Sequence, residues 1–227
     1  MAALIHLCGG ILQRVGVTAA IDEIVYFSAT FGEQFDRHLE EVAHHGGEII
    51  PDHGIVMTYS ASGSVGQACV NAFKAGKKFK VLISEARPIN EGIEMARRLI
   101  DTGIPTTLMT DAALANAVAT AQLVLVGCDA ILPNTVVNKT GTYALALLAK
   151  LAHVPVVCLG TSEKILSETH LDSFKIIPHP AREISPELPQ ALKVENVYFD
   201  QTPLPLFHTI LLETGPMTMD LTETRPA

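Results

Sequence analysis

The chain has 227 residues, a mass of 24.3 kDa and a formal net charge of -8 at pH 7. Its hydrophobic fraction of 48% predicts a compact globular protein and excludes the disordered class. The negative charge and the lack of a basic stripe exclude sequence-independent nucleic-acid binding, which needs clustered Lys and Arg, so we expect no direct nucleic-acid partner.

The cysteines and the N-terminus bear on the cellular compartment. Cys8, Cys69, Cys128 and Cys158 are widely spaced without a CxxC pair. This spacing predicts reduced, buried thiols in a cytoplasmic protein and not a disulfide framework. The apolar N-terminus lacks a leading positive region, and no apolar run approaches the roughly 20 residues that span a bilayer. We therefore expect neither a signal peptide nor a membrane partner.

Residues 1–50 predict a short helical N-terminal segment. In the stretch EQFDRHLEEVAHHGG, the side chains of Phe35, Leu39 and Val42 fall on one helix face. The glycine pair Gly46-Gly47 predicts the end of this helix.

Residues 51–227 predict a Rossmann-like α/β domain. Short apolar runs alternate with amphipathic helices, and strands that are apolar on both faces and joined by helices are typical of a parallel sheet. The sequence therefore predicts a doubly wound parallel sheet. Its expected strands span residues 54–58, 79–84, 104–110, 121–127 and 154–160.

Two helices of this domain can be predicted in more detail. In the helix at 90–101, we expect Met95, Leu99 and Ile100 to face the sheet. Glu94 and Arg98 then form an i,i+4 pair on its outer face. At the other end of the chain, VYFDQTPLPLFHTILLETG (197–215) predicts a strand followed by a closing helix.

The loops that follow the carboxyl ends of the strands form the ligand crevice in such a sheet. Arg87 and Lys139 are the leading candidates there, since neither cation has an obvious structural role without an anion. A guanidinium suits two-pronged recognition of phosphate. The alternative is a salt bridge from Arg87 to Glu85 or Glu91.

The run NKTGT (138–142) predicts the start of a helix, where backbone N–H groups and the hydroxyls of Thr140 and Thr142 can face an anion. The alternative interpretation of this run is that Thr140 only caps the helix. Asp129 follows a buried strand, where a partly desolvated carboxylate is available for proton transfer. A cap or turn residue is the alternative interpretation.

Several other classes of site are excluded. His44-His45 beside Glu40-Glu41 is more typical of a solvated helix face than of a metal site, because no second cluster has ligand spacing. The GxGxxG, GxxxxGK[ST] and GxSxG motifs are missing, so dinucleotide, P-loop and nucleophile-elbow readings fail. We expect no metal and no cofactor.

Five ordered segments resemble the motif series of one family: SEARPINEG, TGIPTTLMTDAA, VLVGCDAI, VVNKTGTYALALLAK and FDQTPLPLFHTILLETG. The family contains the alpha, beta and delta subunits of translation initiation factor 2B, methylthioribose-1-phosphate isomerase and ribose-1,5-bisphosphate isomerase. The resemblance covers residues 53–215. It implies helices packed on a Rossmann-like domain, a homodimer or higher oligomer, and, in the isomerase branches, a small phosphorylated sugar as ligand.

The isomerase branches of this family use a cysteine in a Thr-His-Cys-Asn pattern and an aspartate in a Gly-Ala-Asp pattern. Asp129 matches the catalytic aspartate. By the same resemblance, Arg87, Asn138 and Lys139 match groups that bind the substrate or shape its site.

The cysteine is not matched. Aligning Thr58 with the motif threonine places Tyr59 at the histidine, Ser60 at the cysteine and Ala61 at the asparagine. A thiol with a pKa near ~8.5 exchanges protons near neutrality, whereas a hydroxyl is a far weaker acid. Cys128 is the nearest thiol, with either a relocated catalytic role or a buried structural one. The segment that encloses the substrate in the isomerases, with its Arg-Gly pair, has no equivalent in residues 1–50.

The resemblance therefore predicts an initiation-factor-2B-like protein with a retained pocket for a sugar phosphate or nucleotide monophosphate, regulatory or assembly-related and not catalytic. The alternative is an aldose-ketose phosphate isomerase, an intramolecular oxidoreductase, in which Asp129 transfers the proton with help from Ser60, Cys128 or water. A purely structural subunit is the third reading. The predicted ligand-binding residues are Thr58, Ser60, Ser62, Arg87, Asn138, Lys139 and Lys164.

Overall fold

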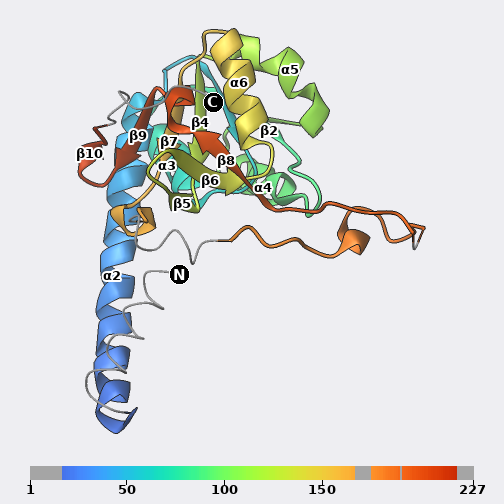
Figure 1. Cartoon of the computed structure of the whole chain (residues 1–227). Coiled ribbons are helices and arrows are strands. Elements are labelled where there is room, and N and C mark those ends of the chain that lie inside the picture. Colours follow the sequence, from blue (N-terminus) through green and yellow to red (C-terminus); the bar gives the residue numbers. More distant parts are fainter. Residues whose placement is uncertain (1–16, 167–174, 190, 219–227) are drawn as a thin grey trace.

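The computed structural model describes residues 17–166, 175–189 and 191–218 (Figure 1). A seven-stranded sheet runs through its centre in the order β10-β9-β7-β4-β1-β2-β3, and all neighbours are parallel except β10 and β9. The strands are β1 (Ile55–Tyr59), β2 (Lys80–Ser84), β3 (Thr106–Met109), β4 (Leu123–Gly127), β7 (Val156–Leu159), β9 (Thr209–Leu212) and β10 (Gly215–Pro216). Each of the five predicted strands is present, within two residues of its predicted bounds.

Helices cover both faces of this sheet, which confirms the doubly wound α/β class. One core holds Val56 of β1 together with Val42 of α2, Val65 of α3 and Met95 of α4. The opposite core holds Met57, the next residue of β1, because side chains alternate across a strand. It is covered by α5 and α6. The helices are α2 (Val17–Ile49), α3 (Gly63–Lys74), α4 (Glu91–Asp101), α5 (Leu114–Ala117) and α6 (Thr142–Leu151).

A second, three-stranded antiparallel sheet lies beside the main one and was not predicted. It runs in the order β5-β6-β8, with β5 (Ala130–Ile131), β6 (Thr135–Lys139) and β8 (Phe199–Pro203). Residues 138 and 139 therefore end a strand, and the helix predicted to open at NKTGT begins only at Thr142. β6 pairs with the short β5 just before it and also with β8, which lies about 60 residues further along the chain, so no local pattern marks the pairing with β8.

Helix α2 does not end at its glycine pair but continues to Ile49, so that prediction was wrong. Gly46 and Gly47 are buried because α2 approaches α3 there. A Cβ on Gly46 would lie 2.6 Å from Leu159 Cδ1 and 2.9 Å from Ala68 Cβ. The pair thus allows close helix packing, a role that the sequence does not distinguish from helix termination.

The C-terminus of α2 is closed by a side chain from the loop after α3. Lys77 Nζ donates hydrogen bonds to the carbonyl oxygens of Gly47 at 3.0 Å, Glu48 at 2.6 Å and Ile50 at 2.7 Å. An ammonium at this end also complements the helix dipole.

Helix α4 follows its predicted pattern with two exceptions. Met95 and Leu99 are buried against the sheet, as expected. Ile100 is 53% exposed, because it lies one residue past the buried stripe. Glu94 pairs with Arg97 at 3.7 Å, an i,i+3 contact, and not with Arg98.

Residues 197–215 contain the predicted strand but no closing helix, so the helix prediction was wrong. After β8 come a single turn of 3-10 helix (Leu204–Leu206) and then β9, which pairs in parallel with β7. Pro203 and Pro205 lack the N–H groups that a helix needs, and the apolar Ile210–Leu212 fills a buried sheet position.

Residues 175–189 and 191–198 form an extended arm that leaves the body of the molecule (Figure 1). At its base, Pro178 and Val197 form an isolated antiparallel bridge, and the rings of His179 and Tyr198 stack 3.5 Å apart.

Cys69, Cys128 and Cys158 are free and buried, as predicted, whereas Cys8 and the apolar N-terminal run lie outside the described residues. None of the described helices combines the length and apolarity of a membrane-spanning segment. The division of the chain at residues 50 and 51 into two units stays a prediction.

Candidate functional site

Three side chains from different elements meet at the carboxyl edge of the sheet. Ser60 follows β1 with a φ of 63°, Glu91 begins α4, and Lys139 ends β6. Lys139 Nζ lies 2.7 Å from Glu91 Oε2, and Ser60 Oγ donates a hydrogen bond to the same oxygen at 3.1 Å. Two of the predicted site residues are thus joined through Glu91, which the sequence analysis considered only as a partner of Arg87.

Lys139 is a buried cation, with only 4% of its surface exposed. Its ammonium lies 4.6 Å from the centroid of the Tyr198 ring, a cation–π contact with the base of the arm. A buried charge is tolerated in a protein only when it is paired. The Glu91 carboxylate and the Tyr198 ring supply that pairing.

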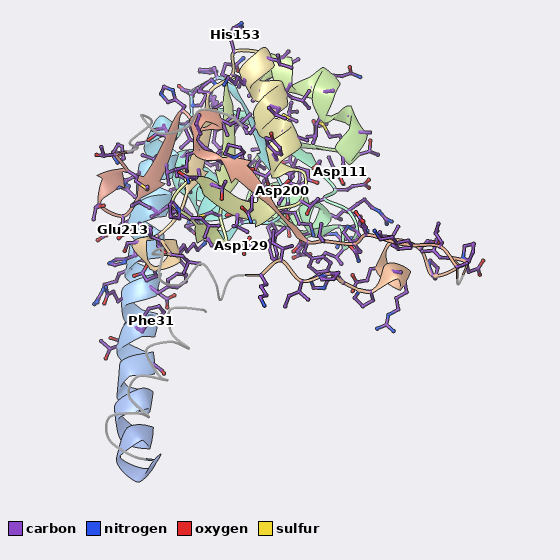
Figure 2. The ribbon with its side chains drawn as sticks, viewed as in Figure 1. Phe31, Asp111, Asp129, His153, Asp200 and Glu213 are labelled. Carbon is purple, nitrogen blue, oxygen red and sulfur yellow. The ribbon has the colours of Figure 1, made fainter. Side chains whose placement is uncertain are left out.

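Asp129 lies at the same edge, just after β4 (Figure 2), and its backbone N–H donates to Val137 O at 2.8 Å. The residue is exposed, yet partial burial of its carboxylate raises its pKa. Glu91 raises this pKa further, while Lys164 and Lys139 act in the opposite direction. A carboxylate with a raised pKa at a strand end is suited to proton transfer.

Lys164 reaches this edge from the 3-10 helix Ser162–Lys164 that follows β7. Its ammonium donates a 2.6 Å hydrogen bond to the carbonyl oxygen of Cys128, directly before Asp129. The structure therefore brings Ser60, Asp129, Lys139 and Lys164 to one place, as the strand-end argument predicts.

Thr58 and Ser62 lie in and just after β1, and neither contacts the other predicted site residues through a hydrogen bond within the described part of the chain. Thr58 is buried, and its hydroxyl lacks a hydrogen-bond partner among the described residues. Ser62 caps α3 by accepting from Val65 N at 3.4 Å. A Cβ on Gly127 would collide with the Ser62 hydroxyl, so the glycine of VLVG makes room for this cap. A ligand-binding role for both residues stays a prediction.

Asn138 is buried and directed away from Lys139, since neighbours in a strand alternate. Its Nδ2 donates to Thr142 Oγ1 at 3.0 Å, and that hydroxyl donates to Lys139 O at 2.7 Å. Asn138 thus braces the turn between β6 and α6, and contact with a ligand is still a prediction.

The amino end of α6, predicted to face an anion, is occupied by a carboxylate of the chain. Asp200 Oδ2 accepts hydrogen bonds from the backbone N–H groups of Gly141 at 2.7 Å and Tyr143 at 3.1 Å. Burial raises the Asp200 pKa, although both N–H groups lower it. Thr140 does not cap the helix: its hydroxyl donates to Val197 O at 2.8 Å.

Asp200 is a residue that the sequence analysis missed (Figure 2). It lies in the quoted FDQTP motif, but its place opposite Asn138 depends on the pairing of β6 with β8.

Arg87 is exposed, and its Nη2 donates to the carbonyl oxygen of Ile184 in the arm at 2.6 Å. Neither salt bridge considered for it, to Glu85 or Glu91, is formed within the described part of the chain. Asp111, also missed, holds this loop by accepting from the backbone N–H groups of Ala86 and Arg87 at 2.9 Å and 2.8 Å.

Tyr59, at the motif position of histidine, is buried against the start of α6, where a Cβ on Gly141 would collide with its ring. Burial is the main cause that raises the pKa of its hydroxyl, followed by the charges of Asp111 and Asp200. Cys128 is buried, with its sulfur 3.8 Å from Leu159 O, which fits the structural alternative for this thiol.

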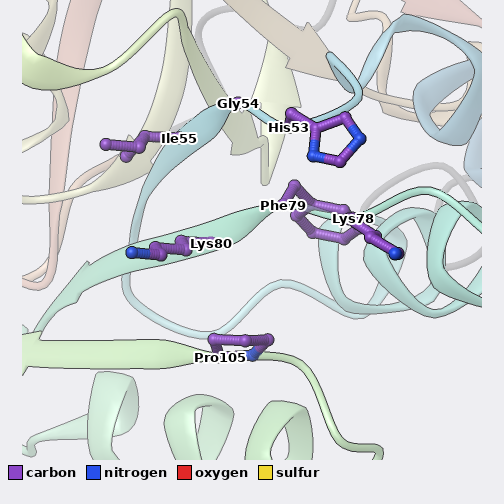
Figure 3. Close-up of a pocket in the computed structure, with 7 residues that line it drawn as sticks. All are labelled: His53, Gly54, Ile55, Lys78, Phe79, Lys80 and Pro105. Carbon is purple, nitrogen blue, oxygen red and sulfur yellow. The ribbon is translucent and has the colours of Figure 1, made fainter.

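A separate hollow lies at the opposite, amino-terminal edge of the sheet (Figure 3). None of the predicted site residues lines it. Its lining residues are His53, Gly54, Ile55, Lys78, Phe79, Lys80 and Pro105.

A family model described as "Initiation factor 2 subunit family" matches residues 15–219. Curated relatives carry two kinds of name. A translation initiation factor eIF-2B subunit 2-like protein of Pyrococcus furiosus is 30% identical over 81% of this chain and 66% of its own length. The ribose 1,5-bisphosphate isomerase of Archaeoglobus fulgidus is 33% identical over 81% of this chain and 59% of its own.

A methylthioribose-1-phosphate isomerase of Geobacter metallireducens is 32% identical over 95% of this chain and 66% of its own length. The chain thus spans between about three fifths and two thirds of the length of these relatives. Initiation-factor names and isomerase names occur at similar identity, so identity alone does not separate the two functions.

Solved structures show the same fold. Translation initiation factor eIF-2B of Pyrococcus horikoshii has a TM-score of 0.82 at 26% identity, covering 99% of this chain and 78% of its own. The eIF-2B delta subunit of A. fulgidus has a TM-score of 0.76 at 25% identity, covering 91% of this chain and 66% of its own.

Proposed function

Because the chain belongs to the initiation factor 2 subunit family, we propose that it is an initiation-factor-2B-like protein that binds a small phosphorylated ligand without catalysing its conversion. The ligand is a sugar phosphate or a nucleoside monophosphate. The observation that carries this proposal is Ser60, whose hydroxyl donates a hydrogen bond to Glu91. By the motif resemblance, this residue takes the place of the reactive thiol of the isomerases.

Binding is supported by the cations at the carboxyl edge of the sheet. Lys139 and Lys164 lie there on different elements, next to Asp129. Loops at this edge are the usual ligand crevice of an open α/β sheet. A buried ammonium such as that of Lys139 has a fixed position, so it gives a phosphate group a defined place.

The lack of catalysis is supported by proton chemistry. Isomerisation of an aldose phosphate needs two groups that exchange protons near neutral pH. Asp129 has the raised pKa of such a group, but Ser60 is a far weaker acid and donates its hydrogen bond to Glu91.

A role through assembly in the cytoplasm completes the proposal. A tetrameric beta2-delta2 complex of eIF2B from Chaetomium thermophilum shares the fold, with a TM-score of 0.75 at 21% identity. We propose that this chain forms a homodimer or a higher oligomer, and sedimentation velocity of the purified chain tests this directly.

Ligand binding is tested by thermal-shift screening of wild type against sugar phosphates and nucleoside monophosphates. We expect at least one of them to raise the melting temperature, with the rise lost in Lys139→Met and kept in Lys150→Met. Lys150 is a suitable control because it is exposed on the last turn of α6. A flat response of wild type across the whole panel counts against the proposal.

An isomerase is the second candidate, and the Asp129 carboxylate favours it, since its raised pKa suits a proton-transferring group. The names of the Archaeoglobus and Geobacter relatives define the substrates to test, ribose 1,5-bisphosphate and methylthioribose 1-phosphate. Product formation that is abolished in Asp129→Asn would establish this activity. Turnover that survives the substitution would exclude Asp129 as its proton-transfer group.

A further inference from the structure

We propose that Glu91 is an internal counter-ion of Lys139 that an anionic ligand has to displace, and that it therefore sets the affinity of the site for phosphate groups. This inference rests on the proposed function, since it concerns the same crevice. It assigns a role to a residue that the strand-end argument leaves out.

The two side chains of the ion pair differ in solvent exposure. The Lys139 side chain is 5% exposed, whereas that of Glu91 is 37% exposed. Glu91 is also the first residue of α4. When the pair breaks, the carboxylate can rotate into water at little solvation cost, but the ammonium stays in place and needs another anion. A phosphate is such an anion.

The other cations of the site are also engaged within the chain. Lys164 Nζ donates to Cys128 O at 2.6 Å, and Arg87 Nη2 donates to Ile184 O at 2.6 Å. Among these three cations, Lys139 is the one with a full opposite charge at contact distance within the described residues, 2.7 Å from Glu91 Oε2. A phosphate beside this pair meets the repulsion of Glu91 together with the attraction of Lys139, so phosphate binding becomes an exchange of anions.

Ser60 determines how firmly Glu91 is held. Its hydroxyl donates to the same oxygen that contacts Lys139, so it holds Glu91 in the blocking position. If Ser60 bound the ligand directly, Ser60→Ala would lower the affinity of the protein for the ligand. If Ser60 instead anchors Glu91, Ser60→Ala raises the affinity for the ligand, because it releases the Glu91 carboxylate. The sign of this one effect separates the two roles.

The ligand class follows from the released carboxylate. Inorganic phosphate displaces Glu91 and offers it nothing in return, while the hydroxyls of a sugar phosphate can donate hydrogen bonds to it. The site is therefore selective for phosphate esters with hydroxyls over phosphate alone, and this selectivity depends on the Glu91 charge.

The experiment is isothermal titration of wild type, Glu91→Gln and Glu94→Gln with ribose 1,5-bisphosphate and with inorganic phosphate. Glu94→Gln is the matched control: it removes the same charge from the same helix, at a side chain that is 64% exposed and paired with Arg97. We expect Glu91→Gln to bind both anions about tenfold more tightly than wild type, with the larger gain for inorganic phosphate. Glu94→Gln should match wild type.

Each outcome bears on one of the two proposals. Equal or weaker binding by Glu91→Gln, with binding by wild type intact, overturns the counter-ion role and leaves the proposed function standing. Absence of binding of both anions by all three proteins overturns this inference, and the proposed function falls with it only if the thermal-shift panel is flat as well. If Glu91→Gln does not fold, Glu91→Asp replaces it, since the shorter side chain keeps the charge but weakens the contact with Lys139, and a smaller gain in affinity is expected.

Discussion

The Asp200 carboxylate accepts a 2.7 Å hydrogen bond from the backbone N–H of Gly141, at the amino end of α6. An acidic side chain from β8 thus takes the position that a ligand anion occupies at many helix starts. The amino end of α6 is therefore not free for a phosphate, and we expect the side-chain cations Lys139 and Lys164 to contribute to phosphate binding at this crevice.

Asp200→Ala should lower the free energy of unfolding by about 1–2 kcal/mol, because two N–H groups of α6 lose their acceptor and the helix dipole loses its counter-charge. Asp200→Asn keeps one carbonyl acceptor and should lose less. Urea denaturation followed by circular dichroism measures both. Equal stability of the alanine variant and wild type would show that water replaces the cap without cost.

Gly46→Ala should destabilise the protein by about 1–3 kcal/mol, because the added Cβ overlaps Leu159 and Ala68. Gly32→Ala is its control in the same helix. Apart from the helix's own backbone, no atom of the described residues lies within 4 Å of a Cβ at that position, so alanine there should stabilise by roughly 0.5–1 kcal/mol through its higher helix propensity. Melting temperatures of the two variants should therefore move in opposite directions, and a parallel change would contradict the packing argument.

Lys77→Met should lower the free energy of unfolding by about 1–2 kcal/mol, since three carbonyl groups at the end of α2 lose a charged donor. Lys74→Met provides the comparison, because Lys74 is exposed on the last turn of α3. Chemical denaturation of both variants gives the difference. A loss of equal size in the two would assign the effect to net charge and not to helix closure.

Asp129 should make the protein less stable as the pH rises. Its pKa in the folded state is raised, so the folded state holds this proton more tightly than the unfolded state does. The stability linked to it is full below the unfolded pKa and is lost as the pH passes the folded pKa. Asp129→Asn should thus be more stable than wild type at pH 7, by no more than about 0.5 kcal/mol because the group is exposed, and equal to it at low pH.

Asp52 should have the opposite effect on the pH dependence of stability. A hydrogen bond from the Lys78 backbone N–H is the main cause that lowers its pKa. Its stabilising contribution is present above the unfolded pKa and is lost as the pH falls through the folded pKa. Asp52→Asn should therefore be less stable than wild type at pH 7. Denaturant midpoints measured from pH 3 to pH 8 test both assignments, and a shift of the two variants in the same direction at pH 7 would contradict one of them.

The parallel sheet was predictable because its first five strands along the chain are short, mostly apolar runs separated by helical patterns and turn residues. The strand at 123–127 is buried on both faces, and this is visible in LVLVG itself. The small sheet was not predictable, because β6 finds its partner β8 only in three dimensions. The prediction of a closing helix was wrong for a related reason. The segment Thr209–Leu212 is short and apolar, and it forms a strand because it pairs with β7.

The location of the site was predictable, but its internal connections were not. Strand ends brought Ser60, Asp129 and Lys139 together as expected. Glu91 is the first residue of a helix and precedes a glycine, and carboxylates are common at helix starts. Its contact with Lys139 could therefore not be predicted from the sequence. Arg87, by contrast, has the predicted location but a carbonyl partner in the arm, about 100 residues away in the chain.

The two sheets meet at the site, and this has a mechanical consequence. Lys139 ends β6, and the Asp129 backbone donates a hydrogen bond to β6. Ser60 instead follows β1 of the main sheet, and Glu91 begins α4, which packs on that sheet. A small sliding of one sheet past the other would lengthen the contact between Lys139 and Glu91 without altering either strand ladder. A partner that bound β8 and shifted the small sheet would therefore change the distance between Lys139 and Glu91 without contacting either residue, and with it the affinity of the crevice.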